Sequence, residues 1–139
     1  MATYVDPNRS QFEQFKALPR DQPIMMLNLI QLNETAVYPD GTTTTGAAAY
    51  AAYGRESHPI FSALGGEIIW RGVPQNVLIG PEDELWDIGF IARYPDAASF
   101  LAMVTNPDYQ KAVVHRQVAV KDSRLLRMGE AREGRGFAE

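Results

Sequence analysis

The segment Pro23 to Leu32, PIMMLNLIQL, is almost continuously aliphatic and carries Asn28 near its centre. Such a run lacks the apolar–polar alternation of a half-exposed strand and is typical of a central strand buried on both faces. An unpaired amide in that setting is costly, so Asn28 either lines a pocket or satisfies a neighbouring bulge or helix end. The segment predicts the middle of a sheet, and the rest of the chain has to supply its neighbours.

Turn residues and hydrophobic spacing predict those neighbours. We expect a helix at 10–18 capped by Ser10, a helix at 47–64 that Pro59 kinks or interrupts, strands at 67–71 and 85–94, a helix from 96 that is interrupted at Pro107 and resumes through His115, and a strand at 123–130. A second extended piece should follow the strand at 67–71 and reach Gly80. The threonines at 42–45 predict either a hairpin arm or the lead-in to the next helix.

This order is a helix followed by β-α-β-β-α-β, which predicts an α+β, ferredoxin-like fold: one four-stranded antiparallel sheet with both long helices on one face. The opposite sheet face is also apolar and needs a second layer, and another copy of the chain can provide it. We therefore predict a homodimer. We expect one domain over 1–139, with a core at 24–128 and a tail at 129–139 that a neighbour holds through Phe137.

Composition narrows the classes of function. The chain has 139 residues, a formal net charge of −4 and no cysteine, and its pI is about 5.2. With no run of Lys or Arg, nucleic acid and membrane surfaces are not expected partners. No apolar run approaches the roughly 20 residues that span a bilayer, and we expect a cytoplasmic protein. Neither cysteine ligands nor a two-histidine motif is present, so we predict no metal and no cofactor.

Several spaced strings resemble a known family. They are MMLNLIQL, AYAAYG, ALGGEIIWRG, WDIGFIARYP, FLAMVTNPDYQKAVVHR and DSRLLRM, and they cover roughly residues 24 to 128. In these strings the chain resembles domain of unknown function family 1330, of the dimeric α+β barrel superfamily. The resemblance implies a cavity between sheet and helices or within the barrel. It implies no assigned reaction, because fold analogy alone does not carry function.

Arg116 is the strongest candidate for a binding residue. It follows Tyr109, Ala112 and Val113 at helical spacing, which places a guanidinium on an apolar helix face. Burial of this group is costly unless it has a partner or reaches a cavity. We predict that it enters a cavity near the strand carrying Arg93 and binds a small carboxylate. The alternative is a structural ion pair with Asp87, Asp122 or Glu130.

Three further residues are candidates for the same site. His115 either shuttles a proton or bonds a backbone carbonyl. Trp70 either lines an aromatic pocket or fills the core. Arg93 shares a strand face with Gly89 and either meets a ligand there or forms a surface ion pair.

Two classes of function follow from these candidates. The first is a cofactor-independent enzyme, with His115 as the catalytic residue and with Asn28, Trp70, Arg93 and Arg116 binding a small organic, possibly anionic, molecule. The second is a non-catalytic module in which the same residues only recognise the ligand. The third alternative is a barrel whose interior is filled by side chains, in which case the protein acts through its surface.

Overall fold

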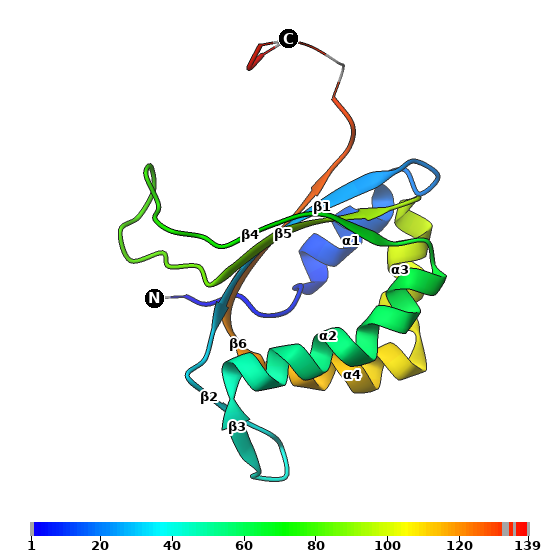
Figure 1. Ribbon diagram of the computed structural model, residues 1–139. Coiled ribbons are helices and arrows are strands. Elements are labelled where there is room, and N and C mark those ends of the chain that lie inside the picture. Colours follow the sequence, from blue (N-terminus) through cyan, green and yellow to red (C-terminus); the bar gives the residue numbers. More distant parts are fainter. Residues whose placement is uncertain (1, 132–133, 135, 139) are drawn as a thin grey trace.

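A computed structural model describes residues 2–131, 134 and 136–138. Along the chain the elements are α1 (Arg9–Ala17), β1 (Ile24–Leu32), β2 (Thr35–Val37), β3 (Thr43–Thr45), α2 (Gly46–Ala63), β4 (Glu67–Gly72), β5 (Ile88–Tyr94), α3 (Ala97–Thr105), α4 (Pro107–Ala119) and β6 (Val120–Met128) (Figure 1). Among the described residues, no helix is long and apolar enough to cross a membrane.

The main sheet has four strands in the order β4-β5-β1-β6, and each neighbouring pair is antiparallel. This is the predicted ferredoxin-like α+β arrangement, with β1 between β5 and β6. The helices α2 and α4 lie side by side over one face, and α1 and α3 lie near one end of that layer (Figure 1). The threonines form both predicted alternatives: Thr43–Thr45 is a hairpin arm, and the Thr45 side chain caps α2 by accepting from the amide of Ala48.

The core lies between the sheet and the helices. Its buried members from the sheet are Ile24, Met26, Ala92 and Tyr94, and those from the helices are Phe61, Ala97, Phe100, Met103 and Tyr109. The ring of Tyr94 meets Phe61 and Phe100 edge-on, each at a centroid distance of 5.3 Å. Such T-shaped contacts favour a fixed arrangement of rings in addition to the burial of apolar surface.

The expectation that β1 is buried on both faces is wrong for the single chain. Ile24, Met26 and Ile30 are buried, whereas Met25, Leu27 and Leu29 on the other face are only partly buried. The reason is the alternation of side chains along a strand, because only one face of the sheet is covered by helices. The outer face remains apolar and half-exposed.

Two helix details also differ from expectation. The cap of α1 is Asn8 and not Ser10, because the Asn8 side chain accepts a hydrogen bond from the amide of Gln11 at 2.8 Å. Pro59 does not interrupt α2, which runs to Ala63. A proline removes the bond to the carbonyl four residues earlier, that of Arg55, and both residues are exposed so that water can satisfy this carbonyl.

The connection between β4 and β5, residues 73–87, is here called the β4–β5 arm. It contains no strand where an extended piece up to Gly80 was expected, and it projects beyond the sheet (Figure 1). Its large apolar side chains are exposed: Val73 by 82%, Leu78 by 86%, Ile79 by 93% and Leu85 by 60%. In the tail, Phe137 is fully exposed, while residues 132, 133, 135 and 139 lie outside the described residues. The predicted anchoring of Phe137 on a neighbour stays a prediction.

Candidate ligand cavity

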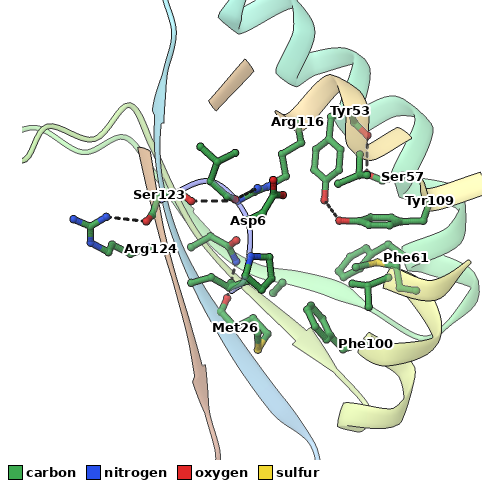
Figure 2. Close-up of a pocket in the computed structure, with 18 of the residues that line it drawn as sticks. Asp6, Met26, Tyr53, Ser57, Phe61, Phe100, Tyr109, Arg116, Ser123 and Arg124 are labelled. Carbon is green, nitrogen blue, oxygen red and sulfur yellow. Dashed lines mark hydrogen bonds between the residues drawn. The ribbon is translucent and has the colours of Figure 1, made fainter. Parts of the chain in front are cut away.

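A half-open cavity of about 1670 Å³ lies between the helices α2 and α4 and the sheet face that they cover, here called the cavity face (Figure 2). Apolar and aromatic side chains make up much of its wall, among them Met26, Phe61, Phe90, Phe100, Met103 and Val113. Polar and charged side chains also line it, and they come from the helices, from the sheet and from the segment that precedes α1. A lining of this mixed kind suits a small molecule, whose orientation the polar groups set.

Two tyrosine hydroxyls meet at the wall formed by the helices. The hydroxyl of Tyr53 on α2 lies 2.8 Å from that of Tyr109 in the first turn of α4 (Figure 2). Asn106 positions Tyr109 by capping α4, because its side chain accepts from the amides of Asp108 and Tyr109. In such a pair one hydroxyl donates to the other, which leaves one O–H free to donate to a ligand.

Burial keeps the phenol of Tyr109 neutral. It raises the pKa of Tyr109 well above its ordinary value, and the neighbouring Tyr53 adds to the rise both electrostatically and through its hydrogen bond. Burial also raises the pKa of Tyr50 and Tyr94, which line the same cavity. The cavity therefore offers hydrogen-bond donors and not phenolate bases near neutral pH.

Arg116 lies at the cavity as predicted, and its hydrogen bonds go to groups that the sequence did not predict. Its Nη1 donates to the carbonyl of Val5 at 2.5 Å, and its Nη2 lies 3.4 Å from the hydroxyl of Ser123 (Figure 2). Within the described residues it forms no ion pair with Asp87, Asp122 or Glu130, so the ion pair of the structural alternative is not formed. Asp122 instead pairs with Arg124, and Asp87 accepts from the amide of Leu32.

Asn28 also lines the cavity, where its side-chain amide donates to the carbonyl of Met26 at 3.0 Å. This bond lies within its own strand and satisfies one donor of the amide. The oxygen and a second donor hydrogen remain for a ligand. The ligand-binding roles of Asn28 and Arg116 stay predictions.

Arg93 and Trp70 lie on the other face of the sheet, which corrects their predicted position. Arg93 alternates with Ala92 and Tyr94, and only the latter two line the cavity. Trp70 is 62% exposed. It sits after an irregularity in which Ile68 pairs with Ala92 but Trp70 pairs with Ile91, and this bulge moves Trp70 to the outer face.

The same bulge brings a different guanidinium to the cavity. Arg71, one residue after Trp70, pairs with Phe90 and lines the cavity edge. The sequence did predict two guanidiniums at one cavity, but Arg93 is not one of them: besides Arg116, the arginines that border the cavity are Arg9, Arg71, Arg124 and Arg127. The error for Arg93 lies in β5, where the face it shares with Gly89 was taken to meet the ligand, whereas the alternate face with Ala92 and Tyr94 lines the cavity.

His115 is not a cavity residue. Its Nδ1 lies 2.6 Å from the Tyr38 hydroxyl, and its Nε2 lies 2.6 Å from Glu56 Oε2. Successive residues of a helix point about 100° apart, so Arg116 faces the cavity and His115 does not. The histidine joins α4 to α2 and to the hairpin region, and it bonds side chains in place of the backbone carbonyl considered above. Its catalytic role stays a prediction that the cavity geometry does not support.

Sequence reasoning missed the hydroxyl pair, Ser123 and the N-terminal segment. Tyr53 and Tyr109 fell at core spacing, and nothing in the sequence showed that their hydroxyls would meet. The segment Tyr4 to Pro7 has no periodicity, yet all four residues line the cavity. Within the described residues, no group of three His, Asp or Glu side chains could hold a metal ion.

The sheet order and the single helical layer define a ferredoxin-like α+β protein with a cavity beneath its helices. Residues 41–129 match the family model described as a domain of unknown function, DUF1330, and the chain belongs to that family. No curated protein matches the chain.

Solved structures agree with this assignment. The chain is 51% identical to RPA0582, a protein of unknown function from Rhodopseudomonas palustris. The methylated form of RPA0582 superposes with a TM-score of 0.92 over 97% of this chain and 100% of that one, and a second structure does so with 0.89 over 95% and 100%. SnoaB, a cofactor-independent oxygenase from Streptomyces nogalater, is similar in fold, with 12% identity and a TM-score of 0.51 over 81% of this chain and 96% of that one.

Proposed function

We propose that this protein binds a small organic molecule, mostly aromatic or aliphatic and bearing an acceptor oxygen, in the cavity between its sheet and helices. The observation that carries this proposal is the Tyr53–Tyr109 hydroxyl pair at the wall of a large apolar cavity. Ligand pockets commonly enclose about 300–1,000 Å³, so the cavity is large enough for such a molecule. The aromatic wall favours a flat ring, and the free phenolic O–H favours an oxygen on it.

Binding without chemistry is favoured over catalysis. Neutral phenols donate hydrogen bonds but do not remove protons near neutral pH, and His115, the imidazole predicted to transfer a proton, lies outside the cavity. The other imidazole, His58, borders the cavity from an exposed position on α2. A cofactor-independent enzyme remains the second candidate for one reason: two adjacent neutral phenols also stabilise a developing oxyanion. The likeness to SnoaB supports the shared fold alone.

We further propose that the protein is a homodimer whose sheets pack face to face. Trp70, Leu126 and Met128 are exposed on the outer face, and Leu27 and Leu29 between them are only partly covered. The exposed apolar side chains of the β4–β5 arm extend this surface beyond the sheet edge. A monomer would leave the whole apolar surface in water, whereas a second copy covers it with the same surface.

Neutral aromatic probes test the proposed cavity. Benzamide and phenol should bind the wild type in calorimetry or ligand-observed NMR. Tyr53→Phe and Tyr109→Phe should each weaken binding by roughly 2- to 10-fold, because each removes one hydroxyl from a hydrogen bond that contributes about 0.5–1.5 kcal/mol. Tyr38→Phe is the matched control, since it removes a hydroxyl outside the cavity.

Absent binding of both probes would contradict the proposal. Equal affinities in all four proteins would place the site elsewhere. Chemical change of either probe, followed by NMR over time and abolished by Tyr109→Phe, would favour the enzyme over the binding module.

A further inference from the structure

Residues 4–7, here called the N-terminal strap, lie along the cavity between α4 and β6 (Figure 2). Side chains of these two elements hold the strap. Asp122 accepts from the amide of Tyr4 at 2.9 Å, Ser123 donates to the carbonyl of Tyr4 at 2.7 Å, and Arg116 donates to the carbonyl of Val5 at 2.5 Å.

No backbone ladder supports these contacts. Within the part of the chain that the structure describes, no backbone–backbone hydrogen bond joins residues 4–7 to another element. The remaining polar contact is a long one, 3.5 Å between the Gln117 amide and the Asp6 carboxylate. A segment with few backbone bonds and mostly exposed residues opens locally at low cost compared with the core.

The acceptors that Arg116 bonds in the cavity are weak ones for a guanidinium. Its partners are a neutral carbonyl and a hydroxyl, and it forms no ion pair with any described carboxylate. A carboxylate accepts shorter and roughly twice as strong hydrogen bonds from a guanidinium as a neutral oxygen does. The Val5 carbonyl therefore occupies a position that a carboxylate would fill better.

Arg116 lines the same cavity as the buried tyrosines. Its positive charge acts on both Tyr50 and Tyr109, which line the same cavity. A flat ring against the tyrosines can thus carry a carboxylate toward Arg116. The Asp6 carboxylate of the strap also lines the cavity, so its negative charge opposes an anionic ligand while the strap is closed.

We propose that the ligand of this cavity is an aromatic carboxylate, and that it displaces the Val5 carbonyl from Arg116 and so releases the N-terminal strap. This inference rests on the proposed cavity function and adds the charge of the ligand and the route by which it enters. Arg116 is then the latch: it holds the strap in the free protein and the ligand in the complex. Binding and strap closure exclude one another, so each weakens the other.

A fluorophore on the strap and a matched pair of probes test this latch. The chain has no cysteine, so Thr3→Cys provides one thiol for an environment-sensitive label at an exposed position. Benzoate and benzamide are nearly equal in shape and differ in charge. In the full-length labelled protein, benzoate should change the emission of the label on saturation, and benzamide should bind without changing it.

Three variants separate the latch from a structural role. Arg116→Met keeps the apolar stem and should weaken benzoate about tenfold while leaving benzamide within about twofold. Asp122→Ala removes the acceptor of the Tyr4 amide from a residue that does not itself line the cavity, and it should tighten benzoate by about threefold, because the competitor is weakened. Arg71→Met, at another guanidinium of the cavity, should weaken benzoate less than Arg116→Met does.

The outcomes distinguish the two proposals. Two results overturn the latch and leave the cavity function intact. In the first, benzamide binds but benzoate leaves the emission of the label unchanged. In the second, benzamide binds but benzoate binds equally well to the wild type and to Arg116→Met. Weaker benzoate binding in both Arg116→Met and Asp122→Ala also overturns it, because a structural role moves both variants in the same direction. A loss in Arg71→Met alone assigns the carboxylate to Arg71. No binding of either probe overturns both proposals.

Discussion

Both faces of the sheet are largely apolar, but they serve different purposes. Along β1, Ile24 and Met26 face the helices and are buried, whereas Met25 and Leu27 face outward and are only partly buried. The first set is part of a core closed by α2, α3 and α4, whereas no element of the described chain covers the second set to that degree. The comparison teaches that apolar character alone does not distinguish a core face from an interface face, because both exclude water in the final assembly.

The outer face is nevertheless ordered by specific contacts. The guanidinium of Arg124 lies 5.1 Å from the ring centroids of both Tyr4 and Trp86, and it pairs with Glu84 at 3.1 Å and Asp122 at 2.8 Å. These contacts hold the end of the β4–β5 arm and the start of the N-terminal strap against β6. Burial of the Asp122 carboxylate opposes its charge, but hydrogen bonds from the Tyr4 amide and from Arg124 outweigh this and lower its pKa.

The largest effect should come from paired substitutions in β1. Ile30 is fully buried on the cavity face and Leu29 is its neighbour on the outer face. Ile30→Ala should lower the free energy of unfolding by about 2–5 kcal/mol at every protein concentration, because it leaves a cavity in the core. Leu29→Ala should act through the dimer, so its effect in denaturant titrations should depend on protein concentration. Concentration-independent effects in both variants would contradict the difference between the faces.

A second pair in β6 tests the dimer directly. Leu126 pairs with Leu27 on the outer face, and Leu125 pairs with Asn28 on the face toward the helices. Both border the cavity. Leu126→Glu should raise the dimer dissociation constant by about 100-fold or more, because two like charges would be buried against each other across the two-fold axis. Leu125→Glu should leave the dimer intact and alter ligand binding. Light scattering at micromolar concentration measures the oligomeric state of both variants, and a monomeric wild type would overturn the proposed dimer.

The smallest effect should appear at high pH. Burial, followed by the charge of Tyr53, raises the pKa of Tyr94 above its ordinary value of 10.0, and Tyr50 and Tyr109 behave alike. Because the folded state disfavours the phenolate, this contribution to stability is full below pH 10 or so and is lost as the pH rises above it.

The phenolate absorbance of the tyrosines on the cavity face should therefore rise only at the high pH at which the protein also unfolds. Tyr94→Phe removes one such group and should make the loss of stability with pH less steep. Its hydroxyl has only a weak partner, the sulfur of Met103 at 3.8 Å, so the substitution itself should cost little. An early rise in absorbance equal to that of all six tyrosines would contradict the burial of Tyr50, Tyr94 and Tyr109.

Much of the fold followed from local patterns. The aliphatic run at 23–32, the break at Pro107 and the glycines at 65–66 placed the central strand and the ends of the helices correctly, because they depend on the chemistry of a few adjacent residues. Pattern reading also placed Arg116 at the cavity, since helical spacing fixes which residues share a face. It was less successful wherever two distant segments had to meet, as with Tyr53 and Tyr109 or with Arg116 and Val5.

By itself, the sequence determined the order of elements, the ferredoxin-like topology and the family, because hydrophobic period, caps and turn residues act over a few positions. Only the tertiary structure decided which other arginines border the cavity, that His115 bonds Tyr38 and Glu56 outside it, and that the N-terminal strap lines it. A bulge of one residue in β4 reversed the faces of Trp70 and Arg71. Such outcomes depend on register and on contacts between residues up to 119 positions apart, and no local pattern encodes them.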